Sequence, residues 1–100
     1  MSKHVLFGQL KANPGQRDEL AQTMLANVET LRNMEGCIYY ILNESIDDPD
    51  LLWIMEMWEN ADAHAASLKN ENVRALIERC RPLIAGGSAI PVRPIGGKGL

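Results

Sequence analysis

An almost unbroken apolar run extends from Leu51 to Trp58 and is interrupted only by Glu56. A run of this length predicts a strand that is covered on at least one face. Because side chains alternate between the two faces of a strand, Leu52, Ile54, Glu56 and Trp58 should share one face and Leu51, Trp53, Met55 and Met57 the other. A carboxylate between Ile54 and Trp58 needs a hydrogen-bond partner.

The segment after this strand has the pattern of a short helix. Asn60 is a favourable N-cap residue and the following residues are rich in alanine, so we expect a helix from Ala61 to Leu68. His64 lies one turn inside that helix. The Glu56 carboxylate, the Trp58 indole and the His64 imidazole should therefore lie close together.

The N-terminal part of the chain alternates between strand and helix patterns. His4 to Lys11 predicts a first strand, and the turn residues Asn13-Pro14-Gly15 precede a helix that should begin at Gln16. Its apolar positions recur at helical spacing, so one amphipathic helix is expected until Gly36 ends it. A second, apolar strand follows, and its alternation predicts two faces, Cys37, Tyr39, Ile41 and Asn43 on one and Ile38, Tyr40, Leu42 and Glu44 on the other.

The C-terminal part predicts one more helix and one more strand. Asn70 should cap a helix whose apolar stripe is Val73, Leu76, Ile77, Cys80, Leu83 and Ile84. Gly86 and Gly87 are expected to close that helix, and Ser88 to Ile95 should form the last strand. This strand belongs at a sheet edge, because Pro91 and Pro94 cannot donate backbone hydrogen bonds.

The order β-α-β-β-α-α-β predicts a ferredoxin-like α+β fold, a four-stranded antiparallel sheet with helices on one face. We expect a single domain over residues 1–100, with Gly96 to Leu100 as a mobile tail. Strands two and three are apolar on both faces, and such a surface is too large to leave in water. The sequence therefore predicts a homodimer in which a second copy covers the free face of the sheet.

Composition narrows the class of partner. The chain is 46% hydrophobic and 23% charged with a formal net charge of -3, and no cluster of basic residues suggests a nucleic-acid or membrane surface. No secretory or membrane-spanning segment is evident, so the cytoplasm is the expected location. Cys37 and Cys80 lack metal-ligand spacing, and the acids of Asp47 to Asp50 read as a solvated turn. We expect no metal, flavin, haem or other cofactor.

Several short motifs carry a resemblance to a known family. They are Glu35-Gly36-Cys37, Asp48-Pro49, Glu56-x-Trp58 and the alanine-rich helix with His64. The chain resembles the antibiotic biosynthesis monooxygenase (ABM) domain family, small dimeric α+β barrels that include quinol monooxygenases. The family's haem-degrading branch uses an asparagine, a tryptophan and a histidine where this sequence has Gly8, Ser67 and Ile77, so haem degradation is disfavoured.

The resemblance implies a cofactor-independent monooxygenase of quinol-like or polycyclic phenolic aromatics, which needs an apolar pocket and one base. His64 is the expected base and Glu56 the second choice, while Trp58, Tyr40, Leu68, Phe7 and Asn43 are the expected substrate-binding residues. His4, near the terminus, is assigned no role.

Two other functions remain open. An isomerase or other enzyme acting on a small polar signalling molecule would need cationic groups in the pocket, and Arg79 and Arg81 qualify only if their helix turns them inward. A non-catalytic ligand-binding or stress-related module would tolerate replacement of His64. Structural interpretations also stay open for two residues: Glu56 as an acid bonded to an arginine or to backbone across the dimer, and His64 as a residue on the surface or behind the site.

Overall fold

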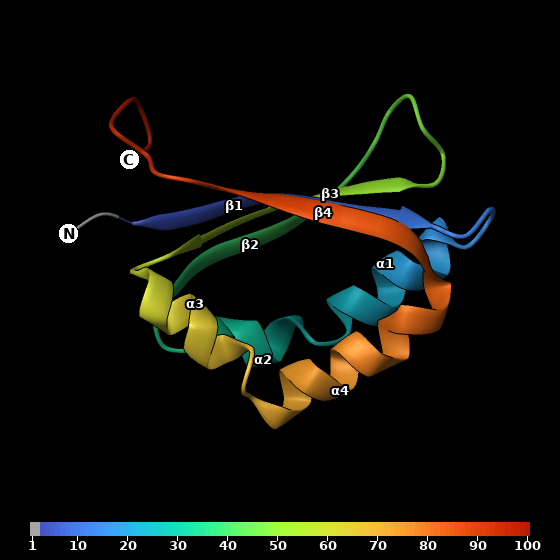
Figure 1. Ribbon diagram of the computed structural model, residues 1–100, viewed down its shortest axis with the longest axis horizontal. Coiled ribbons are helices and arrows are strands. Elements are labelled where there is room, and N and C mark those ends of the chain that lie inside the picture. The colour runs from blue at the N-terminus through green and yellow to red at the C-terminus, as the bar shows by residue number, and fades with distance from the viewer. Residues whose placement is uncertain (1–2) are drawn as a thin grey trace.

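The computed structural model describes residues 3–100 and contains one antiparallel sheet with all helices on one side of it (Figure 1). The elements in chain order are β1 (His4–Ala12), α1 (Arg17–Leu25), α2 (Val28–Arg32), β2 (Cys37–Glu44), β3 (Leu51–Trp58), α3 (Ala61–Ser67), α4 (Glu71–Cys80), the 3-10 turn η1 (Arg81–Leu83) and β4 (Ile84–Val92). The strand order is β2-β3-β1-β4. This arrangement confirms the predicted ferredoxin-like α+β fold.

The core lies between the sheet and the helices. Its buried side chains come from β1, α1, β3, α4 and η1, and they are Ala12, Leu20, Met24, Leu52, Ile54, Cys80 and Leu83. Both cysteines are free thiols, and Cys80 is buried in this core as its position in the helical stripe predicts. Within residues 3–100, the helices are too short to cross a bilayer.

The predicted first helix is in fact two helices, α1 and α2, which meet at Ala26 and Asn27. The Asn27 N–H donates to the Met24 carbonyl, three residues back, at 3.2 Å, so the four-residue spacing of α1 ends there. The Asn27 side chain also accepts a hydrogen bond from Thr30 Oγ1 at 3.0 Å. Such local side-chain bonds favour a break in a helix, and hydrophobic periodicity does not detect them.

The last strand begins earlier than predicted. Gly86 and Gly87 lie inside β4, not at a helix end, and β4 extends from Ile84 to Val92 instead of from Ser88 to Ile95. A Cβ on Gly87 would lie 3.0 Å from the Gln9 carbonyl oxygen and 2.8 Å from the end of the Leu10 side chain, so glycine lets β4 lie close to β1 without a shift. The expected edge position is confirmed, because β4 is the last strand in the sheet order and pairs with β1 on one side. At the edge, Pro91 does not have to donate a backbone hydrogen bond to a further strand.

One face assignment on β2 is also wrong. The register between β2 and β3 shifts between Cys37 and Tyr39, which is a β-bulge. Because the extra residue of a bulge reverses the alternation, Cys37 pairs with Trp58 and shares the helix-facing side with Tyr40. After the bulge, Tyr39, Ile41 and Asn43 lie on the opposite face, as predicted.

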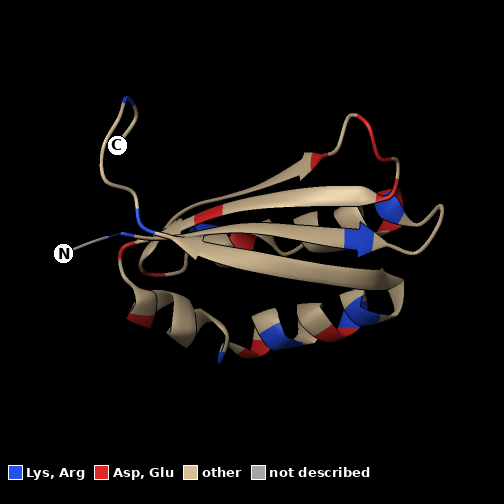
Figure 2. Cartoon of the chain, turned by 45° about the horizontal axis from the view of Figure 1, so that its top comes forward, with Lys and Arg blue, Asp and Glu red and all other residues tan. Residues whose placement is uncertain are grey.

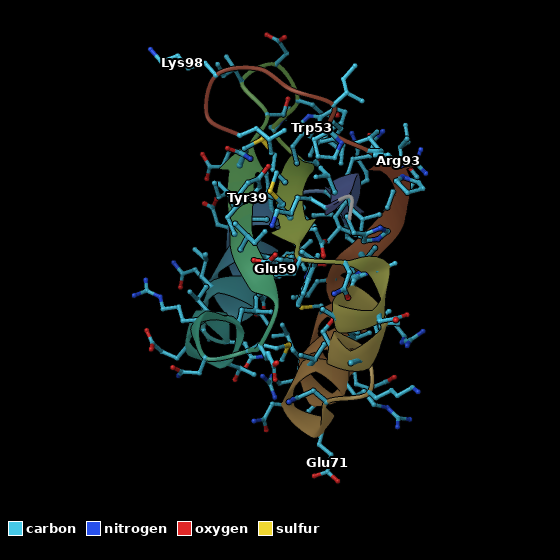
Figure 3. The ribbon with its side chains drawn as sticks, turned by 90° about the vertical axis from the view of Figure 1, so that its left-hand side faces the viewer. Tyr39, Trp53, Glu59, Glu71, Arg93 and Lys98 are labelled. Atoms are coloured by element: carbon cyan, nitrogen blue, oxygen red, sulfur yellow. The ribbon has the colours of Figure 1, made fainter. Side chains whose placement is uncertain are left out.

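The face of the sheet that the helices leave uncovered, here called the open face, is apolar. One cross-strand row on it runs through all four strands and consists of Ile41, Met55, Phe7 and Ile90. Phe7, Trp53 and Ile90 are between 42% and 63% exposed. The strands carry few charged residues along their length (Figure 2). Figure 3 shows Trp53 on the side away from α3 and α4.

Candidate functional site

A cavity of about 270 Å³ lies between the helix-facing side of the sheet and the helices α2, α3 and α4. Most of its wall is apolar, and these residues are Leu10, Met24, Leu31, Ile54, Leu68, Val73, Leu76, Ile77, Cys80 and Ile84. Its polar or polar-tipped residues are Asn27, Tyr40, Glu56, Trp58, His64 and Ser67. A concave, mostly apolar wall with a few convergent polar groups is typical of a small-molecule site.

The acid of the cavity is held by a neighbour on its own strand. Glu56 and Trp58 are two residues apart on β3, so both side chains point toward the helices. The Trp58 indole N–H donates to Glu56 Oε1 at 2.8 Å, and the Trp58 side chain is fully buried. The carboxylate predicted to need a partner therefore has one, and the indole fixes its orientation.

The imidazole of the cavity is positioned by the start of α3. As predicted, Asn60 caps this helix, and its side chain accepts a hydrogen bond from the Ala63 N–H at 2.8 Å. Gly36, at φ +84°, lies against the same turn, and a Cβ on it would come within 2.5 Å of Ala63 Cβ. These two contacts bring the His64 ring against the Trp58 indole, with 5.5 Å between ring centroids.

His64 and Glu56 form a pair of proton-accepting groups on the cavity wall. His64 Nε2 lies 3.5 Å from Glu56 Oε1, and both side chains are mostly buried. Burial lowers the pKa of His64 below the usual imidazole value, outweighing the opposite effect of the Glu56 carboxylate. The ring is therefore neutral at pH 7 and can accept a proton.

Tyr40 contributes a hydroxyl that stays protonated. It lies on β2 directly across from Glu56 and lines the cavity. Burial raises the pKa of Tyr40 far above the usual phenol value, and the Glu56 carboxylate adds to this effect. Tyr40 can therefore donate or accept a hydrogen bond but does not serve as a base near pH 7.

The structure brings together most of the residues singled out from the sequence. Trp58, His64, Tyr40 and Leu68 line the same cavity as Glu56, between the sheet and the two helices expected to cover it. Phe7 and Asn43 do not belong to this site. Phe7 pairs with Met55 and Asn43 with Trp53, so the pleat turns both side chains to the open face.

Sequence reasoning also missed functional candidates. Ser67 lines the cavity, and its hydroxyl donates to the His64 carbonyl at 2.6 Å, which fastens the last turn of α3. His4 stacks on His64, with 5.1 Å between ring centroids. His4 could have been found from the antiparallel pairing of β1 with β3, because that pairing places His4 opposite Trp58.

Several charged residues outside the cavity have structural partners. Arg81 of η1 pairs with Glu78 of α4 at 2.9 Å on the surface, and neither Arg79 nor Arg81 lines the cavity. In the acidic turn, Lys11 pairs with Asp48 and holds the pKa of that carboxyl below its usual range, while Asp50 accepts from the Gly15 N–H at 3.0 Å. Within residues 3–100, side chains do not gather into a cluster suited to a metal ion.

The fold and the cavity define a class of protein: a ferredoxin-like α+β fold with an apolar pocket that contains an acid beside an imidazole. The model of the antibiotic biosynthesis monooxygenase family matches residues 4–79. This chain belongs to that family. Among curated proteins, none matches the chain.

Solved structures agree with this membership. A proposed antibiotic biosynthesis monooxygenase from Chloroflexus aurantiacus is 38% identical, with 98% of each chain covered and a TM-score of 0.86. A protein given the same description from Caulobacter crescentus is 18% identical, with 95% of this chain and 92% of that chain covered and a TM-score of 0.89. A conserved protein from Methanosarcina mazei is 15% identical, covers 93% of each chain and has a TM-score of 0.85. The last two comparisons show the fold alone.

Proposed function

We propose that the protein is a cofactor-independent monooxygenase that oxidises quinol-like or polycyclic phenolic aromatics with O₂. The observation that carries this proposal is the neutral His64 imidazole beside Glu56 on the wall of an apolar cavity. The name of the family and of the Chloroflexus aurantiacus protein support oxygen chemistry in general. The choice of quinols comes from the family resemblance, and the apolar cavity with one neutral base is compatible with it.

The cavity suits deprotonation of a phenol. His64 Nε2 and Glu56 Oε1 lie 3.5 Å apart on the cavity wall, so a phenol hydroxyl that donates its one proton to His64 Nε2 lies beside the carboxylate. His64 takes the hydroxyl proton, and the apolar wall shields the resulting phenolate from water. The phenolate supplies electrons to O₂, whose O–O bond breaks. One oxygen atom replaces a ring hydrogen, the other leaves as water with two substrate hydrogens, one of them the proton held by His64, and a quinol ends as a hydroxyquinone. The substrate is the reductant, so a bound metal or flavin is not required.

The charge of the cavity separates this reaction from the isomerase alternative. A small phosphorylated or carboxylated substrate needs an Arg or Lys to hold it. The part of the wall formed by residues 3–100 includes neither, and its charged side chain is the acid Glu56. An uncharged aromatic fits this wall better than an anion does.

We also propose that the protein acts as a homodimer in which a second copy covers the open face. The exposed row through Ile41, Phe7 and Ile90 supports this proposal. Two further isoleucines, Ile46 and Ile95, are almost fully exposed in the β2–β3 loop and the C-terminal segment. Both segments rise on the side of the sheet away from the helices, where they can flank a second copy (Figure 1).

Oxygen uptake with a panel of quinols tests the enzymatic proposal. We expect His64→Ala to lower the rate by about 10²-fold or more while the fold is kept, because general base catalysis is lost. The wild-type rate should rise with pH through the lowered pKa of His64, below the usual imidazole value. Asp62→Asn, an exposed change on the same helix, is the matched control and should leave the rate unchanged.

Two outcomes would contradict this assignment. An unchanged rate in a folded His64→Ala protein would remove His64 as the base, and Glu56→Gln would then test the carboxylate. If quinols bind but no oxygen is consumed, a non-catalytic ligand-binding module becomes the better description.

A further inference from the structure

His4 is the residue packed behind the proposed base. It is the first residue of β1 and the cross-strand partner of Trp58. Its ring stacks on His64 with 5.1 Å between centroids and 30° between planes, while Trp58 contacts the same imidazole at 5.5 Å. His4 does not line the cavity. His64 therefore packs on two rings that lie side by side on neighbouring strands.

This contact has two physical effects on His64. Two rings that pack on an imidazole restrict its rotation, so its nitrogen stays directed at Glu56. A second titratable imidazole at this distance also disfavours the protonated form of the first, because two like charges would face each other. Both effects increase the fraction of protein molecules in which the His64 ring is neutral and directed at Glu56.

We propose that His4 is a positioning residue whose ring, stacked on His64, holds the His64 imidazole toward Glu56. The catalytic half of this inference rests on the proposed function, because it takes His64 as the proton acceptor. The half that concerns the orientation and charge of His64 does not.

The other charged groups near His64 do not replace this effect. Glu56 of β3 acts in the opposite direction, since a carboxylate favours the imidazolium, and burial and His4 together outweigh it in the pKa of His64. Lys3 and Glu59, at the same end of the sheet, pair with each other at 2.6 Å. The residues of α4 that line the cavity are Val73, Leu76, Ile77 and Cys80, all uncharged. From β2, the cavity wall includes the protonated Tyr40 hydroxyl.

An NMR titration of the two histidines tests the inference without any substrate. His4→Ala removes both the ring and its charge, whereas His4→Phe keeps a ring for stacking and removes the charge. We expect the pKa of His64 to rise in both variants, by about 0.5 to 1 pH unit, the shift expected for like charges about 5 Å apart in a wet environment. Glu19→Gln, an exposed change of charge on α1, is the control and should leave the pKa of His64 unchanged.

The rate of quinol oxidation provides a second readout. In both variants the acid side of the pH profile should move to higher pH, following the pKa of His64. At a pH above that limb, His4→Phe should keep the wild-type kcat, while His4→Ala should lose about 3-fold to 10-fold because the ring is free to turn. KM should change little in either, because His4 does not line the cavity.

The two proposals fail separately. If His64 titrates at the same pH in the wild type and in both folded variants, His4 has no influence on it and the inference is overturned, even if quinols are oxidised. If His64 shifts as expected but no quinol is oxidised, the proposed reaction is wrong and the positioning of His64 by His4 stands.

Discussion

At the residue scale, the side chains of the cavity depend on one another. Glu56 accepts from the Trp58 indole and faces both His64 and Tyr40. Its negative charge favours an imidazolium at His64 and disfavours a tyrosinate at Tyr40. In both cases this raises the pKa, so the proton is held more tightly. Burial opposes this effect for His64 and reinforces it for Tyr40. The result is one neutral base and one protonated hydroxyl around the same carboxylate.

Tyr40 gives a test of this environment at high pH. Its pKa is raised in the folded protein, so the folded state keeps the Tyr40 proton when the unfolded state has lost it. The free energy of unfolding should therefore fall as the pH rises above about 10, the pKa of an unperturbed tyrosine. Urea unfolding at a series of alkaline pH values measures this loss.

Tyr40→Phe is the matched variant for that test, because it keeps the ring and removes the titrating hydroxyl. The variant should lose less stability with rising pH than the wild type. A Tyr40 that ionises in the folded protein near pH 10, seen by tyrosinate absorbance, would contradict the burial of its hydroxyl.

Local sequence rules predicted some of the residues that line the cavity, but not all of them. The period of two along β3 and the Asn60 cap of α3 are local, and they were sufficient to bring Glu56, Trp58 and His64 together. The face on which Phe7 lies was not predictable in this way, because it depends on the register with Met55. The role of His4 depends on the same long-range pairing.

At the element scale, Gly36, which directly precedes β2, sets how closely α3 approaches the start of that strand. Its carbonyl accepts a hydrogen bond from the Glu59 N–H at 2.8 Å, and the absence of a Cβ lets Ala63 pack against it. The position also has a positive φ, which favours glycine for a separate reason. Because α3 carries His64, this contact contributes to the geometry of the cavity.

A pair of glycine variants separates these two reasons. Gly15, at φ +79°, has open space around it, whereas Gly36, at φ +84°, would place a Cβ 2.5 Å from Ala63 Cβ. Gly15→Ala should cost about 1 to 2 kcal/mol of unfolding free energy from backbone strain. Gly36→Ala should cost about 1 to 3 kcal/mol more, because the helix must also move.

Urea unfolding measures both costs, and oxygen uptake shows whether the shift of α3 reaches His64. Equal losses of stability in the two variants would mean that α3 does not press on Gly36 as the structure describes.

The elements that sequence patterns misplaced share a cause. Hydrophobic spacing continues through Asn27, yet local hydrogen bonds end α1 there. Gly87 was predicted to end a helix, but it lies in β4, close to the Gln9 carbonyl of β1. In both places a specific contact, invisible in a periodic pattern, decides the backbone.

At the scale of the whole molecule, the apolar open face is the feature on which the proposed dimer depends. The apolar row through Ile41, Phe7 and Ile90 is half exposed in one chain, and the proposed second copy removes it from water. The sequence predicted that this face is apolar, because β3 has apolar residues on both sides. It did not identify the partner, because an apolar surface specifies burial but not the molecule that buries it.

A charge on the open face should separate the proposed dimer. We expect Trp53→Glu to sediment as a monomer of 11.1 kDa at micromolar concentration while the wild type has twice that mass, because an unpaired carboxylate is costly in an apolar interface. Leu25→Glu is the control, since Leu25 is similarly exposed on α1, on the helical side. A wild type that sediments as a monomer, or a Leu25→Glu protein that dissociates equally, would argue against this interface.

The two-sided use of β3 also limits how its length can vary. Glu56 and Trp58 face the cavity while Met55 and Met57 face the open side, and the register with β1 and β2 fixes this alternation. Insertion of a single residue before Glu56 would exchange the two sets, placing the acid on the apolar surface and a thioether beside the imidazole. Insertions and deletions are therefore tolerable in the β2–β3 loop, residues 45–50, but not within β3. Natural variants of this chain should differ in the length of that loop and not in the length of the strand.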